Sequence, residues 1–198
     1  MGPIVSPQRG LLILDRDGVL NALVVDPEQG TIDSPLHPAE VEVFPWVPRA
    51  LARLAERGYG LAIASNQPAA AKGKTTRQRL AEVHARVLEL AQSEGAVILS
   101  SHFCFHTQED GCACRKPRTG LLEQAFAANP CYDRRSSWMV GDGVHDIQAG
   151  QALSLRTAFL GPRKSEYLRV FEDRSLDPTV WVRDLMELSA VLASDSAP

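Results

Sequence analysis

The sequence predicts an α/β protein built on a Rossmann-like, doubly wound parallel sheet. Short apolar runs without alternation recur along the chain, which is typical of strands buried on both faces. Segments with helical spacing separate these runs, and strands that alternate with helices imply right-handed crossovers. With 198 residues, the chain fits a single domain, residues 1–198, better than two. We expect a core at 11–161 and a C-terminal helical extension at 162–193.

The predicted strands share three properties. Each is short, each is rich in aliphatic residues, and each is bounded by turn residues or charge. The first ends in an acidic residue. They are LLILD (11–15), YGLAIAS (59–65), AVILSS (96–101), SWMVGD (137–142) and RTAFLG (156–161).

The helical segments lie between these strands. In the longest of them, Leu80, Val83 and Val87 share one face. Thr75 with Gln78 fits a capping box at its start. The predicted helices span 47–58, 75–95, 120–129 and 145–153.

Two regions interrupt the alternation. Residues 22–46 form a long excursion rich in proline and turn residues, and loops of that length in compact domains are often functional. Residues 162–198 predict further helices with a short strand at TVWV (179–182), and Trp181, Leu185, Leu188 and Leu192 are expected to pack a terminal helix onto the sheet. The tail 194–198 has a composition typical of disorder.

Composition excludes several classes of function. The hydrophobic fraction of 44% and charged fraction of 23% are ordinary for a globular protein, and no apolar run approaches the roughly 18 residues that a membrane span needs. The first ten residues lack the features of a secretory signal, so we expect a cytoplasmic protein in a reducing compartment. A net charge of −3 argues against a nucleic-acid-binding surface. A small phosphorylated metabolite is the expected partner.

Acidic and polar residues stand where the predicted strands end. Ligands of doubly wound sheets bind beyond the carboxyl ends of the strands. There the sequence offers Asp15 and Asp17, then Ser65, Asn66 and Gln67, and later Asp142 with Asp146. Converging carboxylates repel one another unless a cation lies among them, and hard oxygen ligands suit Mg²⁺. A single acid in such a place is usually a cap or turn residue, whereas the spaced set together with Lys116 favours a catalytic site.

Four ordered motifs resemble those of the haloacid dehalogenase superfamily of phosphohydrolases. They are DRDGVLN (15–21), Ser65 with Asn66, Lys116 and GDGVHD (141–146), and the resemblance covers about residues 11–161. It implies the haloacid dehalogenase fold, here without a large cap domain, since no insertion is long enough to form one.

The resemblance also implies a role for each motif. Asp15 is expected to be the nucleophile that forms an aspartyl phosphate, and Asp17 the general acid and base. Ser65 would hold a phosphoryl oxygen and Lys116 would neutralise the charge of the transition state. Magnesium would be held by the Asp15 carboxylate, the Asp17 carbonyl and Asp142, and Asp146 would either touch it through water or orient Lys116.

The stretch 100–120 predicts a second metal site. Cys104, His106, Cys112 and Cys114 read C-x-H-x5-C-x-C, enough to close a tetrahedral zinc shell with no open position. Such zinc would be structural and would fix the loop that ends at Lys116. Scattered buried cysteines are the less favoured alternative.

The remaining cysteine and histidines are interpreted as ordinary structural residues. Cys131 is expected to pack in the interior and His102 to lie outside the zinc shell. His37, His84 and His145 are expected to be surface or capping residues, with His145 nearest the site.

A zinc loop of this kind is similar to that of the branch containing D-glycero-D-manno-heptose 1,7-bisphosphate 7-phosphatases and histidinol-phosphate phosphatases. The stretch SNQPAAAKGKTT (65–76) favours the heptose enzymes, while the short spacing between His106 and Cys112 resembles the histidinol enzymes. Gly143 stands where the heptose enzymes usually carry lysine. Substrate is expected to meet Ser65, Asn66, Gln67, Lys72, Arg115 and Lys116, with Lys74 and Arg118 nearby.

The sequence thus predicts a magnesium-dependent, zinc-containing phosphomonoester hydrolase, expected to be a monomer as many members of that branch are. Heptose bisphosphate is the favoured substrate and histidinol phosphate the alternative. The amine of histidinol would prefer acids such as Asp26, Glu28 or Asp33. A phosphoryl-accepting signalling module is a remote alternative, because such a module needs neither Asp17 nor a zinc loop. A binding protein without turnover is the least favoured class.

Overall fold

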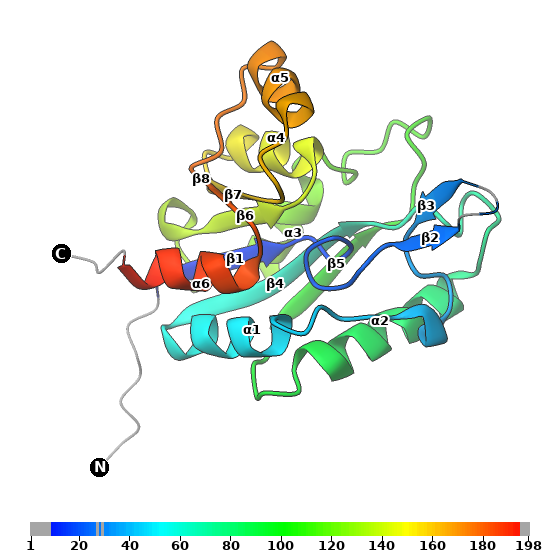
Figure 1. The fold of residues 1–198 in the computed structure, drawn as a ribbon, viewed down its shortest axis with the longest axis horizontal. Helices are drawn as coiled ribbons and strands as arrows, with labels where there is room; N and C mark the ends of the chain where they lie inside the picture. The colour runs from blue at the N-terminus through cyan, green and yellow to red at the C-terminus, as the bar shows by residue number, and fades with distance from the viewer. Residues whose placement is uncertain (1–8, 27, 29, 195–198) are drawn as a thin grey trace.

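A six-stranded parallel sheet forms the centre of the molecule. The computed structural model describes residues 9–26, 28 and 30–194, and the strand order within the sheet is β5-β4-β1-β6-β7-β8. All neighbouring strands run parallel (Figure 1). The strands are β1 (Gly10–Leu14), β4 (Tyr59–Asn66), β5 (Ser100–Cys104), β6 (Trp138–Gly141), β7 (Arg156–Leu160) and β8 (Val180–Val182).

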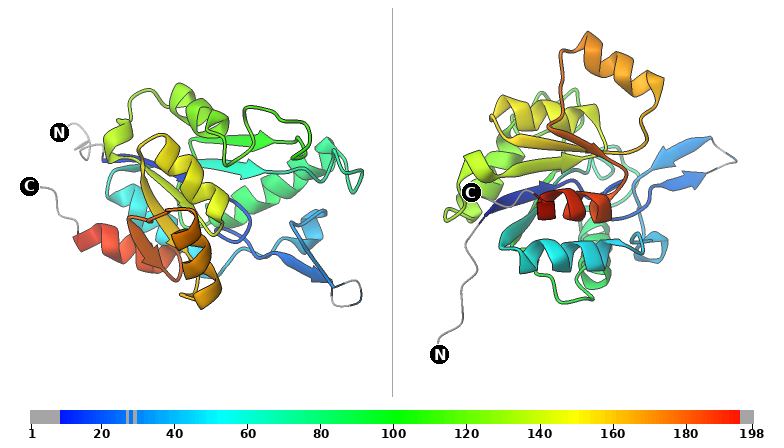
Figure 2. Two further views of the ribbon diagram at one scale, coloured as in Figure 1. Left: turned by 90° about the horizontal axis from the view of Figure 1, so that it is seen from above. Right: turned by 60° about the vertical axis from the view of Figure 1, so that its left-hand side comes forward.

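Helices cover both faces of this sheet (Figures 1 and 2). One face packs against α1 (Val47–Glu56), α2 (Arg77–Ala91) and α6 (Leu185–Ser194). The other packs against α3 (Gly120–Ala128) and α4 (Val144–Ala152), and α5 (Ser165–Asp173) joins α4 over β7 and β8. The doubly wound α/β architecture expected from the sequence is confirmed.

The first strand shows why its sequence is apolar throughout. Leu12 and Leu14 belong to the core under α1 and α6, whereas Leu11 and Ile13 belong to the core under α3. All four are fully buried. Burial of each such side chain contributes about 1.5–3 kcal/mol relative to exposure, so β1 holds the two layers together and fixes the place where the chain leaves the sheet at Asp15.

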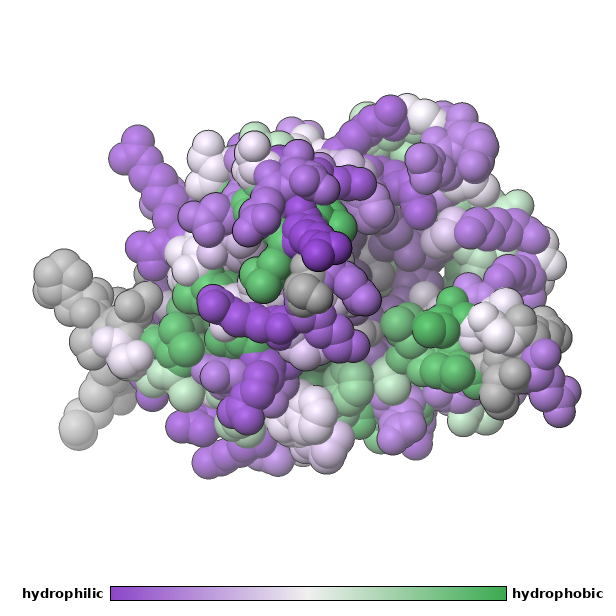
Figure 3. Space-filling view, turned by 45° about the horizontal axis from the view of Figure 1, so that its top comes forward, coloured by the Kyte–Doolittle hydropathy of each residue, from purple (hydrophilic) through white to green (hydrophobic). Residues whose placement is uncertain are grey.

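The excursion after β1 forms a small hairpin rather than a cap domain. Strands β2 (Val24–Asp26) and β3 (Thr31–Asp33) pair antiparallel, and a 3-10 helix, η1 (Pro38–Glu40), follows. His37 caps η1 by accepting a hydrogen bond from Ala39, as expected for a capping histidine. The hairpin projects beyond the sheet (Figure 1) and exposes the apolar side chains of Val25 and Ile32. It carries one of several hydrophobic patches that the space-filling view shows (Figure 3).

The third strand begins later than the sequence predicted. The apolar run suggested 96–101, but β5 starts at Ser100, and Val97 and Leu99 are largely exposed. The strand lies at the edge of the sheet, so its register with β4, from Ala62 opposite Ser100 to Asn66 opposite Cys104, sets its limits. This register carries Cys104 to the end of the strand beside Asn66.

Three further predictions, on the cap of α2, on Cys131 and on Trp181, are wrong. The cap of α2 is Thr76, which accepts from the Arg79 amide, and not Thr75. Cys131 is exposed and does not pack in the interior. Trp181 lies in β8 and packs against Phe159 and Phe171, not through the terminal helix.

The C-terminal extension is part of the same sheet. It contributes β8 and two helices, and Leu185, Leu188 and Leu192 of α6 are fully buried, as expected. Ser194 ends α6, whereas residues 195–198, most of the tail expected to be disordered, lie outside the described residues, as do residues 1–8. No helix in the described part of the chain is long and apolar enough to cross a membrane.

Candidate active site

Most of the predicted catalytic residues meet at the carboxyl edge of the sheet. Asp15 follows β1, Ser65 lies at the end of β4, and Asp142 follows β6. Lys116 reaches the same point from the loop between β5 and α3. The side chains of Ser65 and Lys116 are buried.

Lys116 lies between two acids. Its Nζ is 3.1 Å from Oδ1 of Asp15 and 2.5 Å from Oδ1 of Asp146. The backbone of Lys116 is fixed as well, since its amide donates to Oδ1 of Asn66 and its carbonyl accepts from Nδ2 of Asn66, both at 3.1 Å. Lys116 is therefore held both at its backbone and at its ammonium group. The side-chain amide of Asn66 is used for the two backbone hydrogen bonds.

Three carboxylates form a candidate cation site. Asp15, Asp142 and Asp146 each offer an oxygen, and these oxygens lie within 4.8 Å of one another. Burial raises the pKa of Asp15 to about 6 against the opposing effect of Lys116. Burial, together with Asp15 and Asp146, raises the pKa of Asp142 to about 7. One ammonium does not balance three acids, so the set suits a hard divalent cation such as Mg²⁺.

Two glycines permit this close approach. Gly18 has a φ of +83°, and a Cβ there would collide with the Asp142 carboxylate. A Cβ on Gly141 would collide with Asp146. Gly18 and Gly141 are therefore required where the acids converge.

Asp17 is held by a hydrogen-bond network that the sequence did not reveal. Its carboxylate accepts from Nε and a terminal nitrogen of Arg16 at 3.1 and 3.0 Å, from Asn21 at 2.9 Å and from Gln67 at 2.6 Å. Arg16 is 1% exposed. Gln67 also donates to Ser65 at 3.1 Å, so this network links the loop after β1 to the end of β4.

A polar cavity of about 430 Å³ opens beside Lys116. The predicted residue Arg115 lines it, together with Arg118. Lys72 does not line it and is exposed, and Lys74 pairs with Asp33 in a different cavity. Of the other residues that line it, Gln108, Gln148 and Arg174 were not predicted from the sequence, whereas His145 was expected to lie near the site.

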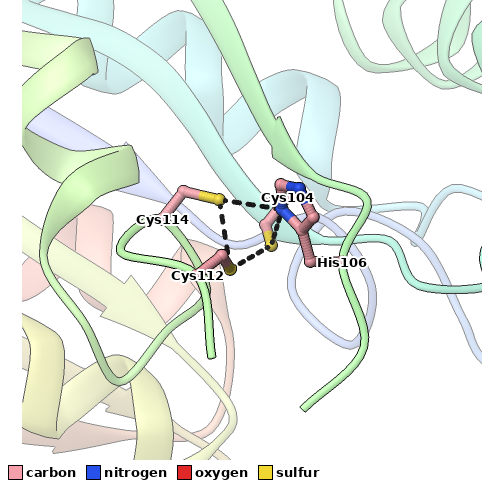
Figure 4. Close-up of side chains that lie close together, drawn as sticks. All are labelled: Cys104, His106, Cys112 and Cys114. Carbon is pink, nitrogen blue, oxygen red and sulfur yellow. Dashed lines mark hydrogen bonds between the residues drawn. The ribbon is translucent and has the colours of Figure 1, made fainter. Parts of the chain in front are cut away.

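The predicted zinc ligands converge as a second cluster (Figure 4). Sγ of Cys112 lies 3.6 Å from Sγ of Cys104 and 3.4 Å from Sγ of Cys114, and Nδ1 of His106 lies 3.6 and 3.3 Å from the sulfurs of Cys104 and Cys114. A tetrahedral shell with zinc–sulfur bonds of about 2.3 Å has sulfur–sulfur edges of roughly 3.8 Å. The cysteines are free thiols, so the cluster fits a closed metal shell.

The cysteine cluster is tied directly to the loop that carries Lys116. A terminal nitrogen of Arg115 donates to the His106 carbonyl at 3.2 Å. Arg118 donates to the Cys112 carbonyl. Since Lys116 stands between these two arginines, the two hydrogen bonds fix the chain on both sides of the lysine.

The other histidines lie outside both clusters. His102 contacts Ser100 Oγ at 3.1 Å. His84 is not the surface residue that was expected: it packs edge-on against Phe103, and burial, assisted by Arg16, lowers its pKa to about 4. Burial and the charges of Arg174, Arg115 and Lys116 lower the pKa of His145.

Comparison with known proteins agrees with this geometry. A model of the HAD-hydrolase-like family matches residues 113–186. The chain is 37% identical over 150 residues to a D-glycero-β-D-manno-heptose-1,7-bisphosphate 7-phosphatase of Pseudomonas aeruginosa, an alignment that covers 73% of this chain and 77% of that protein. The chain belongs to the HAD-like hydrolase family. Its expected class, a phosphatase of this family, is confirmed.

The chain is also similar to a solved heptose bisphosphate phosphatase and to a histidine biosynthesis protein. The crystal structure of a D,D-heptose 1,7-bisphosphate phosphatase from B. bronchiseptica, complexed with magnesium and phosphate, superposes with a TM-score of 0.77 at 26% identity and covers 94% of this chain and 99% of the other. The histidine biosynthesis bifunctional protein HisB of Legionella pneumophila is 33% identical over 73% of this chain and 39% of that protein. The resemblance to the zinc-loop branch is thereby confirmed.

Proposed function

We propose that this HAD phosphatase removes the 7-phosphate of D-glycero-β-D-manno-heptose 1,7-bisphosphate through an aspartyl phosphate on Asp15. The observation that carries the proposal is the buried contact of Lys116 with Asp15 at the edge where three carboxylates converge. The substrate is supported by relatives that bear this name.

Asp15 would attack phosphorus with its free carboxylate oxygen. Magnesium, held by Asp15, Asp142 and the Asp17 carbonyl, would offset the repulsion between that carboxylate and the phosphate dianion. Lys116 lies 3.1 Å from Asp15, near enough to stabilise charge that develops on the transferring phosphoryl group. Asp146 would keep the ammonium in that position.

The residues at the end of β4 would have two roles near Asp15, contact with the phosphoryl group and positioning of catalytic side chains. The Ser65 hydroxyl accepts a hydrogen bond from Gln67 at 3.1 Å and would hold a phosphoryl oxygen once substrate binds. Asn66 and Gln67 were expected to contact substrate, but their side chains are engaged with Lys116 and Asp17, so we assign them to positioning.

Asp17 would give a proton to the leaving oxygen and later take one from the attacking water. In the structure each of its two oxygens accepts two hydrogen bonds, from Arg16 and Asn21 or from Arg16 and Gln67. Proton transfer therefore requires an Asp17 oxygen to exchange one of these donors for the leaving oxygen or for water.

The cysteine cluster would hold zinc with a structural role. Its four ligands fill a tetrahedral shell and leave no position for water or substrate. Burial raises the pKa of Cys104 to about 12, and a bound cation would stabilise its thiolate. We further propose that the enzyme is a monomer, which sedimentation would test.

Histidinol phosphate is the second candidate substrate, favoured by the short spacing between His106 and Cys112 and by the similarity to HisB. The deciding experiment measures phosphate release with Mg²⁺ present for the β and α anomers of the heptose bisphosphate and for histidinol phosphate. The proposal predicts the highest kcat/KM for the β anomer. A higher kcat/KM for histidinol phosphate would replace the proposed substrate while leaving the phosphatase chemistry in place.

A further inference from the structure

The charged side chains that line the cavity beside Lys116 are all positive. Four of its lining side chains are permanent cations, and no carboxylate lines it within the described part of the chain. The remaining lining residues are His145, two glutamines and a proline. A polar cavity of this size with that charge favours an anionic ligand and disfavours an ammonium group. The four cations are Arg115, Lys116, Arg118 and Arg174.

Three of the cations already have protein partners. Lys116 pairs with Asp15 and Asp146, and Arg115 and Arg118 donate to carbonyls of the cysteine loop. The side chain of Arg174 has no hydrogen bond or ion pair with the described residues. An arginine directed to a cavity without a carboxylate partner is available to bind an anion.

Arg174 is nevertheless supported by the core. It directly follows α5, and its amide donates to the Val170 carbonyl at 3.2 Å. Three residues earlier, Phe171 is buried and meets Phe159 and Trp181 edge-on, with ring centroids 5.0 and 5.2 Å away. This aromatic cluster anchors the end of α5 to β7 and β8, so the arginine reaches the cavity from a supported helix end.

We propose that Arg174 is a specificity-determining residue that binds a second anionic group of the substrate, a phosphate remote from the one that is cleaved. The inference rests on the proposed function and deepens it. It gives the C-terminal extension a role in substrate choice. Gly143, next to Asp142, offers no side chain to this cavity, so the added positive charge comes from Arg174, the residue that follows α5.

The same cavity discriminates between the two candidate substrates. A second phosphate would gain charge-assisted hydrogen bonds from Arg174, and from Arg115 or Arg118 when they exchange a carbonyl for it. The ammonium of histidinol phosphate would meet four positive charges. Of the acids expected to attract it, Asp33 is paired with Lys74 in a separate cavity.

The test compares two substrates that differ only in the second phosphate, the heptose 1,7-bisphosphate and the heptose 7-phosphate. For Arg174→Ala we expect kcat/KM to fall by roughly tenfold or more for the bisphosphate and less than about twofold for the monophosphate, because only the former loses a charge-assisted contact. Arg174→Glu should enlarge the first effect and raise kcat/KM for histidinol phosphate. Arg169→Ala is the matched control, since Arg169 lies on α5 but does not line the cavity.

Equal losses for both sugar phosphates, or no loss for either, would overturn the inference. A binding measurement tests the role of Arg174 independently of the proposed reaction. Calorimetry with the Asp15→Asn variant measures the affinity for the two sugar phosphates without turnover. Tighter binding of the bisphosphate that disappears in Asp15→Asn/Arg174→Ala supports the role of Arg174 even if the wild-type enzyme fails to hydrolyse the heptose. Unchanged affinity in the double variant contradicts it.

Discussion

Lys116 Nζ lies 2.5 Å from Oδ1 of Asp146, closer than its 3.1 Å contact with Asp15. Both Lys116 and Asp146 are buried, and a buried ammonium requires partners. We therefore infer that Asp146 holds the lysine beside Asp15, one of the two roles that the sequence left open.

Replacing Asp146 with asparagine should uncouple Lys116 from Asp15. We expect kcat to fall roughly 10- to 1,000-fold, as for the loss of one group that stabilises transition-state charge, and the free energy of unfolding to fall by about 1–3 kcal/mol. Steady-state kinetics and urea denaturation measure the two effects. Glu123→Gln on α3, where Glu123 contacts the Thr119 hydroxyl, is the control, and an Asp146→Asn variant with the same kcat as this control would contradict the role.

Asn66 should act through the backbone of Lys116. Asn66→Ala removes both hydrogen bonds to that backbone, and we expect kcat to fall about tenfold with little change in KM, because the lysine is displaced while the substrate contacts remain. Asn66→Asp keeps the acceptor for the Lys116 amide and should lose less. A rise in KM at constant kcat would instead show that Asn66 contacts substrate.

The cysteine cluster should contribute to stability through its metal. Cys112→Ser combined with Cys114→Ser removes two ligands, and we expect the loss of one zinc equivalent and a Tm lower by at least roughly 5 °C. Elemental analysis and thermal denaturation provide the two measurements. Cys131→Ser is the matched control, because Cys131 is exposed and outside the cluster. Unchanged metal content in the double variant would refute the assignment.

His84 should make the fold less stable in acid. Burial lowers its pKa in the folded state from 6.5 to about 4, so the unfolded chain binds the extra proton first and the stabilisation, full above 6.5, is lost as pH falls from 6.5 towards 4. Because His84 is partly exposed, we expect only about 1 kcal/mol of its stabilisation to be lost between about pH 7.5 and about pH 5.

The measurement for His84 is the free energy of unfolding of wild type and His84→Leu at both pH values. Between about pH 7.5 and about pH 5, the wild type should lose more free energy of unfolding than His84→Leu does, by about 1 kcal/mol. A difference that is independent of pH would show that His84 does not titrate with folding.

The order and type of the main elements could be predicted because the strands of this sheet are buried on both faces. A strand such as β1 must then be apolar at every position, and the pattern is visible in sequence. β5 was misplaced because an edge strand takes its limits from its neighbour: the exposed residues Val97 and Leu99 were as apolar as a buried strand.

The candidate site was predictable where residues are close in sequence or follow a strand. Cys104 to Cys114 are close in sequence, at the end of β5 and in the loop after it. Asp15 and Asp142 follow strands and Ser65 lies near the end of one, all at the same edge of the sheet. Arg174 was missed because its relation to Lys116 depends on how α5 packs against β7 and β8. The network around Asp17 was missed for a similar reason, since Arg16 looks like a surface residue until the fold buries it.

The central claim is that Asp15 becomes phosphorylated and that Asp17 completes the reaction. The most direct measurement mixes Asp17→Asn with p-nitrophenyl phosphate, whose leaving group needs no proton, and follows the burst of p-nitrophenolate together with the mass of the peptide that contains Asp15. We predict a burst of one equivalent per site and a phosphoryl group on Asp15, because hydrolysis of the intermediate lacks its base. The absence of both in Asp17→Asn, with turnover preserved in Asp15→Asn, would contradict it.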